Sequence, residues 1–69
     1  MRFTDPKTLF RADDEQSAER ILDVLAAAAE RSLTPRGTIR IARQSAPDLL
    51  EDIDDATLRE GLRLLWSRQ

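Results

Sequence analysis

The fold of this chain rests on residues 13–33, DDEQSAERILDVLAAAAERSL. Apolar residues recur through this stretch at the i, i+3, i+4, i+7 spacing that gives a helix one buried face. They are Ala18, Ile21, Leu22, Leu25, Ala28, Ala29 and Leu33. Asp13 or Asp14 can cap the start of the helix, where a carboxylate also suits the positive end of the helix dipole. The stretch predicts a helix over residues 13–33 whose apolar face the rest of the chain must cover.

Another helix is predicted over residues 54–67. Asp54 can cap it, and one of its faces is apolar. That face holds Leu58, Leu62, Leu65 and Trp66, with Gly61 among them where a neighbouring helix can approach closely. Trp66 is interpreted first as an anchor of the core and alternatively as an interface residue, because tryptophan is enriched among the residues that dominate binding at interfaces.

Residues 35–46 allow two interpretations. As a helix, the segment has Thr34 as its cap, Pro35 at its first position and Pro47 beyond its end. As a strand, residues 37–43 alternate between polar and apolar side chains, several of them β-branched. We favour the helix because the signals at both ends of the segment agree with it.

The remaining segments are short. Residues 1–12 form an N-terminal arm in which Asp5 and Pro6 predict a single helical turn over residues 6–10. Residues 47–53 form a short link.

Length and composition complete the fold prediction. The chain is too short for more than one domain, and leucine and alanine, which both favour helix, supply much of its apolar content. Residues 1–69 are therefore expected to form a single all-α domain of three helices. The alternative is an α+β domain with a short strand at 37–43.

The composition also limits the chemistry. The chain has no cysteine and no histidine, which removes disulfides, thiolate and imidazole metal ligands and most nucleophile and base pairs. No stretch approaches the roughly 18 apolar residues of a membrane span, and the N-terminus lacks the apolar run of a signal peptide. We expect a cytoplasmic protein that is not an enzyme and needs no cofactor or metal. A domain of this size removes only about 60% of its unfolded surface from water, so we also expect a homodimer.

Charges are segregated along the chain. Residues 31–43 carry four arginines and no acid, whereas residues 48–55 carry five acids and no base. If residues 35–46 are helical, Arg36, Arg40 and Arg43 form one continuous basic surface, the arginine stripe. Its counterpart is left open between the acids of the 13–33 helix, a protein partner and nucleic-acid phosphates. Those acids are Glu19, Asp23 and Glu30. The full set of candidate partner-binding residues is Arg36, Arg40, Arg43, Arg59, Arg63 and Trp66.

The three predicted helices, ending with DDATLREGLRLL over residues 54–65, resemble a helix-turn-helix domain. This resemblance implies a small DNA-binding transcriptional regulator whose last helix would enter the major groove by its N-terminal end. Here that end carries Asp54 and Asp55, and phosphates repel their carboxylates. DNA binding is therefore the alternative function, and these acids argue against it.

In its length and its opening MRFTDP, residues 1–6, the whole chain resembles the small early proteins of Pseudomonas temperate phages that act as anti-activators of quorum sensing. This resemblance implies a dimeric, phage-encoded inhibitor that binds host proteins stoichiometrically. The implied targets are a LuxR-type quorum-sensing transcription activator and the type IV pilus assembly ATPase. No motif of the resemblance identifies binding residues, so the candidate residues rest on the charge pattern alone.

Overall fold

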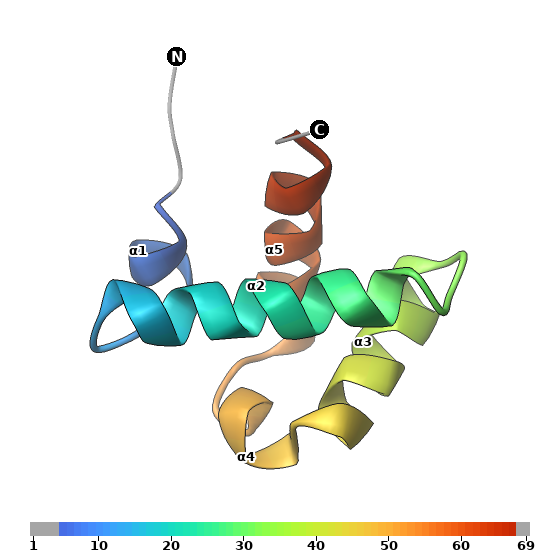
Figure 1. Cartoon of the computed structure of the whole chain (residues 1–69), viewed down its shortest axis with the longest axis horizontal. Helices are drawn as coiled ribbons and strands as arrows, with labels where there is room; N and C mark the ends of the chain where they lie inside the picture. The colour runs from blue at the N-terminus through green and yellow to red at the C-terminus, as the bar shows by residue number, and fades with distance from the viewer. Residues whose placement is uncertain (1–4, 68–69) are drawn as a thin grey trace.

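A computed structural model describes residues 5–67, and within that range the chain forms five helices and no strand (Figure 1). They are α1 (Pro6–Phe10), α2 (Glu15–Ala29), α3 (Pro35–Ser45), α4 (Pro47–Leu50) and α5 (Asp55–Ser67). The predicted all-α fold is confirmed. The strand alternative is wrong, because residues 37–43 lie inside α3. The count of three helices omitted α4, which occupies the predicted link, and α1, which had been expected only as a helical turn.

Side-chain caps start the three long helices. Asp14 Oδ1 accepts a hydrogen bond from Ser17 N at 2.7 Å at the start of α2, which decides between its two candidate caps. Thr34 Oγ1 accepts from Gly37 N at 3.1 Å before α3, and Asp54 Oδ1 accepts from Thr57 N at 2.8 Å before α5. Each bond satisfies a backbone N–H group that has no partner within its helix.

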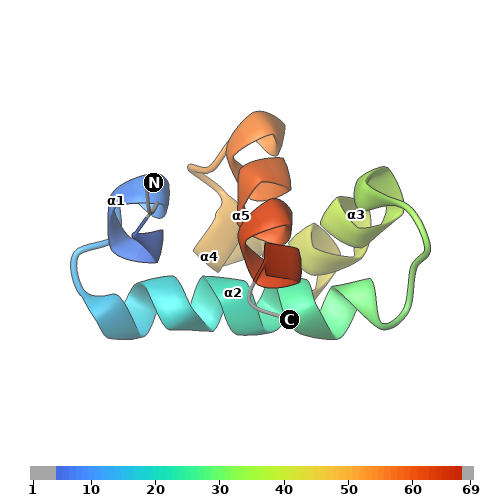
Figure 2. The same ribbon diagram turned by 90° about the horizontal axis from the view of Figure 1, so that it is seen from above.

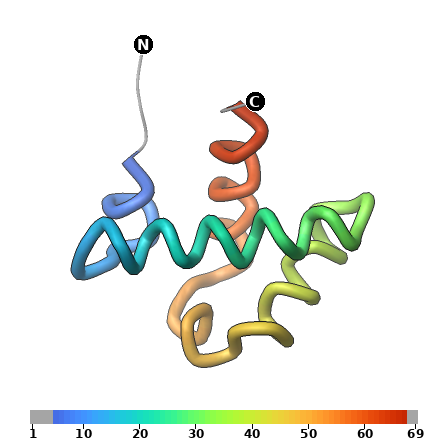
Figure 3. Tube along the Cα trace, in the orientation of Figure 1, coloured from blue at the N-terminus to red at the C-terminus, as the bar shows by residue number. Residues whose placement is uncertain are grey.

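Helix α2 is the platform of the fold. It runs the length of the molecule, and the other four helices lie on one side of it (Figures 1 and 2). Helix α1 lies beside its first half, α3 beside its end, and α5 crosses it between them. The chain reverses direction at α4, so that α5 returns across α2 (Figure 3). None of the described helices is long and apolar enough to cross a lipid bilayer.

The core forms where α2 meets these helices. The buried residues of α2 are Ala18, Ile21, Leu22, Leu25 and Ala28, all from the predicted apolar face. The other helices add Phe10, Ile39, Ala42, Leu50, Leu58 and Leu62. Gly61 lies inside this packing, because a Cβ atom there would stand 2.7 Å from Phe10 Cζ. The close approach expected at Gly61 is thus made by side chains of α1 and α2, since Leu25 Cδ1 would lie 3.0 Å from the same Cβ atom.

Two expected core residues are at the surface instead. Leu33 was placed on the buried face of the first long helix, but α2 ends at Ala29 and Leu33 is fully exposed in the following loop. Trp66 is 51% exposed near the end of α5, where residues of α2 lie beside it. The helical spacing places both residues on apolar faces, but neighbouring helices do not bury either of them.

Candidate functional site

Arg43, a member of the arginine stripe, is used inside the fold. Its Nη1 donates to the carbonyl oxygen of Leu50 at 3.0 Å, and its Nη2 donates to that of Ile53 at 2.7 Å. Nε and Nη2 also reach Asp55 Oδ1, at 3.2 and 2.7 Å. The guanidinium therefore fastens the end of α3 to the end of α4, the following turn and the start of α5.

These contacts give Arg43 a structural role. A guanidinium that already donates to two carbonyl groups and a carboxylate has little capacity left for a partner. The acid that pairs with the stripe is Asp55, outside the predicted set on the 13–33 helix. The stripe is thus partly compensated, which the sequence analysis left open.

Arg36 and Arg40 remain available on α3. Both are exposed, and neither forms an ion pair within residues 5–67. Arg59 of α5 is likewise exposed and forms no ion pair within this described range. Arg40 precedes Arg43 on α3 by about one helical turn, and Arg59 follows Asp55 on α5 by about one turn.

The exposed face of α5 carries the other predicted residues. Arg59, Arg63 and Trp66 follow at i, i+4 and i+7, so they share one side of the helix. Arg63 Nη1 lies 3.3 Å from Glu60 Oε1, in a pair that is largely exposed on both sides. Such surface pairs contribute only about 0–1 kcal/mol, so Arg63 can exchange this contact for another.

Trp66 borders a shallow apolar depression between α2 and α5. The depression has a volume of about 440 Å³, and Leu65 contributes to it from α5. From α2 it is lined by Ala26, Ala27, Ala29 and Glu30. The indole of Trp66 is half exposed at the border of this depression.

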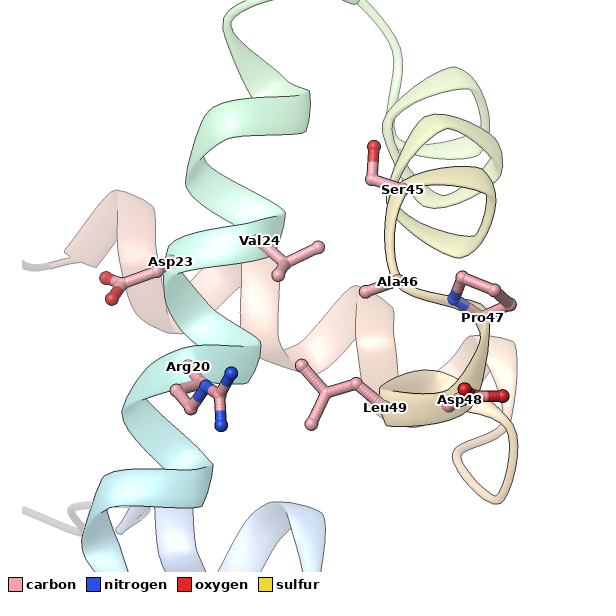
Figure 4. Close-up of a pocket in the computed structure, with 8 residues that line it drawn as sticks. All are labelled: Arg20, Asp23, Val24, Ser45, Ala46, Pro47, Asp48 and Leu49. Atoms are coloured by element: carbon pink, nitrogen blue, oxygen red, sulfur yellow. The ribbon is translucent and has the colours of Figure 1, made fainter.

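A second groove was missed by the sequence analysis. It has a volume of about 660 Å³ and separates α2 from the junction of α3 and α4 (Figure 4). Val24 and Leu49 point into the space from its two walls, and Ala46 lies on the same wall as Leu49. The sequence gives no local signal for this groove, because its walls come from segments more than 20 residues apart.

The pKa shifts explain part of the acidic blocks. The hydrogen bonds to Ser17 hold the pKa of Asp14 below its ordinary value, and those to Thr57 do the same for Asp54. Both shifts are in the direction of helix capping. Within residues 5–67, no group of three or more carboxylates is placed to hold a metal ion.

Comparison of the chain with protein-family models, with curated proteins and with solved structures finds no significant match. The first four residues of the opening that resembles the phage anti-activators lie outside the described part of the chain. The interpretation of function therefore rests on the surfaces described above.

Proposed function

We propose that this chain is a small helical protein-binding domain that inhibits its targets by stoichiometric binding. The observation that carries the proposal is the half-exposed Trp66 on the same face of α5 as Arg59 and Arg63. Tryptophan and arginine are the residues most enriched where a few side chains dominate binding energy at a protein interface.

The chemistry of this face indicates the complementary surface. An unpaired guanidinium at Arg59 and a weakly paired one at Arg63 favour carboxylates on the partner. The indole edge of Trp66 and the adjacent alanines favour an apolar side chain between those carboxylates. Arg36 and Arg40 are two further exposed bases, on α3.

The proposed targets come from the resemblance to phage anti-activators of quorum sensing. They are a LuxR-type transcription activator and the type IV pilus assembly ATPase, bound in the cytoplasm of the bacterial host by a phage-encoded homodimer. An inhibitor of this kind needs binding surfaces and no catalytic group.

DNA binding, the alternative function, has less support. A helix-turn-helix motif joins its two helices by a turn of about three to four residues. Here α3 and α5 are separated by residues 46–54, which include α4. Asp54 and Asp55 stand at the end of α5 that would face the phosphates.

The test is direct binding of the purified chain to each purified target by isothermal titration calorimetry. We expect micromolar or tighter binding that weakens by roughly 10- to 100-fold with Trp66→Ala and less with Arg59→Ala. Lys7→Ala, which removes an exposed charge from α1, is the matched control and should bind like the unchanged chain.

Three results would decide against parts of the proposal. If the chain binds neither protein at high micromolar concentration, both proposed targets are excluded. Equal losses of affinity for the Trp66→Ala and Lys7→Ala variants would show that the α5 face does not bind the target. A complex with duplex DNA that dissociates steeply between about 50 and 200 mM salt would favour the alternative function.

A further inference from the structure

Helix α5 is covered unequally on its two sides where it crosses α2. On one side, α1 fills the corner between α5 and the first half of α2 (Figures 1 and 2). Phe10 of α1 is only 6% exposed, and a Cβ atom on Gly61 of α5 would lie 2.7 Å from Phe10 Cζ. A helix of five residues with one aromatic anchor is thus enough to fill a corner of this kind.

The corner on the other side of α5 holds no helix of residues 5–67. It lies between the second half of α2 and the end of α5, and it contains the depression of about 440 Å³ beside Trp66. In Figure 1 the end of α5 projects above α2, whereas α3 and α4 lie below it and leave this corner open. Ala26 and Ala27 of α2 are exposed, so the apolar walls of the corner face solvent.

The two walls of this corner carry opposite charges. On α5, Arg63 and Arg59 precede Trp66 by three and seven residues, which is about 4.5 and 10.5 Å along the helix axis. Arg59 forms no ion pair within residues 5–67, and Arg63 has only its exposed pair with Glu60. On α2, Glu30 lines the depression. The α5 wall therefore attracts carboxylates, and the α2 wall repels them.

The walls also indicate the backbone conformation of an occupant. Both are helices, which offer no strand edge for an extended segment to pair with. A helical segment satisfies its own backbone N–H and C=O groups and needs only side-chain contacts. Helix α1 already fills the corresponding corner on the other side of α5 in this way.

We propose that the corner between the second half of α2 and the end of α5 receives a short amphipathic helix of a partner protein. This helix places one large apolar side chain beside Trp66 and carboxylates three and seven residues away from it, against Arg63 and Arg59. Two helices that lie side by side have the same rise per residue, so the spacing on α5 is repeated on the partner. The inference rests on the proposed function and specifies the element that the α5 face recognises.

The test uses the fluorescence of Trp66, since the chain has no other tryptophan and no tyrosine. The probes are two stapled, alanine-based helical peptides of about 15 residues, each with one phenylalanine and two glutamates. The glutamates lie three and seven residues before the phenylalanine in one peptide and after it in the other, for the two possible directions of the helix. We expect one peptide to shift the Trp66 emission to shorter wavelength and to saturate, with a Kd between roughly 10 μM and 1 mM.

Substitutions in the chain locate the binding. Ala27→Glu fills the depression from α2 and should weaken the peptide complex by at least about 10-fold. Gln16→Glu makes the same change of charge at an exposed position of α2 outside the depression, so it is the matched control and should bind like the unchanged chain. Both positions are exposed, and circular dichroism should show unchanged helix content.

A charge exchange tests the contact with α5. Arg63→Glu should weaken the complex by roughly 3- to 10-fold, because it replaces an attraction by a repulsion at an exposed site. A peptide with lysine in place of the glutamate nearer to the phenylalanine should bind this variant more tightly than it binds the unchanged chain.

The inference is overturned if neither helical peptide shifts the emission at millimolar concentration, if unstapled peptides broken by a central proline bind as tightly, or if Ala27→Glu binds like Gln16→Glu. An emission shift that grows with the concentration of the chain alone would assign the corner to a second copy, which also overturns it. None of these measurements involves a host protein. Failure here therefore leaves the calorimetric binding of a host protein standing, and failure of that test leaves the peptide site standing.

Discussion

Replacing Arg43 with alanine should remove a large part of the stability of this domain. The two hydrogen bonds to carbonyl oxygens, at 3.0 and 2.7 Å, lie in a partly buried position, and each contributes about 1 kcal/mol or somewhat more because the donor is charged. The ion pair with Asp55 adds only about 0–1 kcal/mol, since that carboxylate is 74% exposed. The sum is about 2–4 kcal/mol, against a total of roughly 3–10 kcal/mol for a domain of 69 residues.

The loss is measurable by urea and thermal denaturation followed by circular dichroism. We expect the unfolding midpoint to fall by roughly 10–25 °C for Arg43→Ala. Arg43→Lys should recover little, because an ammonium group cannot reproduce the planar fork. Arg40→Ala is the matched control on the same helix and should stay within about 0.5 kcal/mol of the unchanged chain. Equal stabilities for the Arg43→Ala and Arg40→Ala variants would refute the structural role of Arg43.

Three further changes test the core and the caps. Gly61→Ala should lower the free energy of unfolding measured in urea by about 1–3 kcal/mol, because the added methyl group meets Phe10. This loss is expected although alanine is the better helix former. A more stable variant would contradict the packing of Phe10 against Gly61. Leu62→Asp should abolish the far-ultraviolet helix signal at neutral pH, since it buries an unpaired charge, and an unchanged melting temperature would show that its assigned face is wrong. Folding lowers the pKa values of Asp14 and Asp54. The stability that these two ionised caps add to the folded state is therefore fully present above the unfolded pKa, and it is lost as the pH falls through the folded pKa. The melting temperature should therefore drop below about pH 4, and less steeply once both residues are asparagine, which caps without titrating; identical acid transitions would argue against the caps.

The helices could be predicted because local signals agree with one another. Asp14, Thr34 and Asp54 cap the three long helices through bonds that span three residues or fewer. The spacing of leucines and alanines then identifies the face that each helix buries. Prediction failed at Leu33 because periodicity continued past the point where the Ser32 and Thr34 hydrogen bonds turn the chain away from α2.

The candidate site was predictable only where a single helix contains it. Spacing along the chain places Arg59, Arg63 and Trp66 on one face, and the exposed side of α5 bears them. The partner of Arg43 could not be found in this way, since Asp55 is 12 residues away and meets it only after the reversal at α4. The groove beside Val24 likewise depends on how α4 is placed against α2.

The packing of Phe10 against Gly61 also bears on how the chain is made in the cell. A ribosome completes Phe10 well before Gly61, so Phe10 lacks its native neighbour on α5 until residues 55–67 have left the exit tunnel. This part of the core therefore forms only after α5 has emerged, and until then the apolar faces of α1 and α2 are open to chaperones and proteases. A premature stop codon before Gly61 would leave a fragment without the helix that covers Phe10, and such fragments should be degraded.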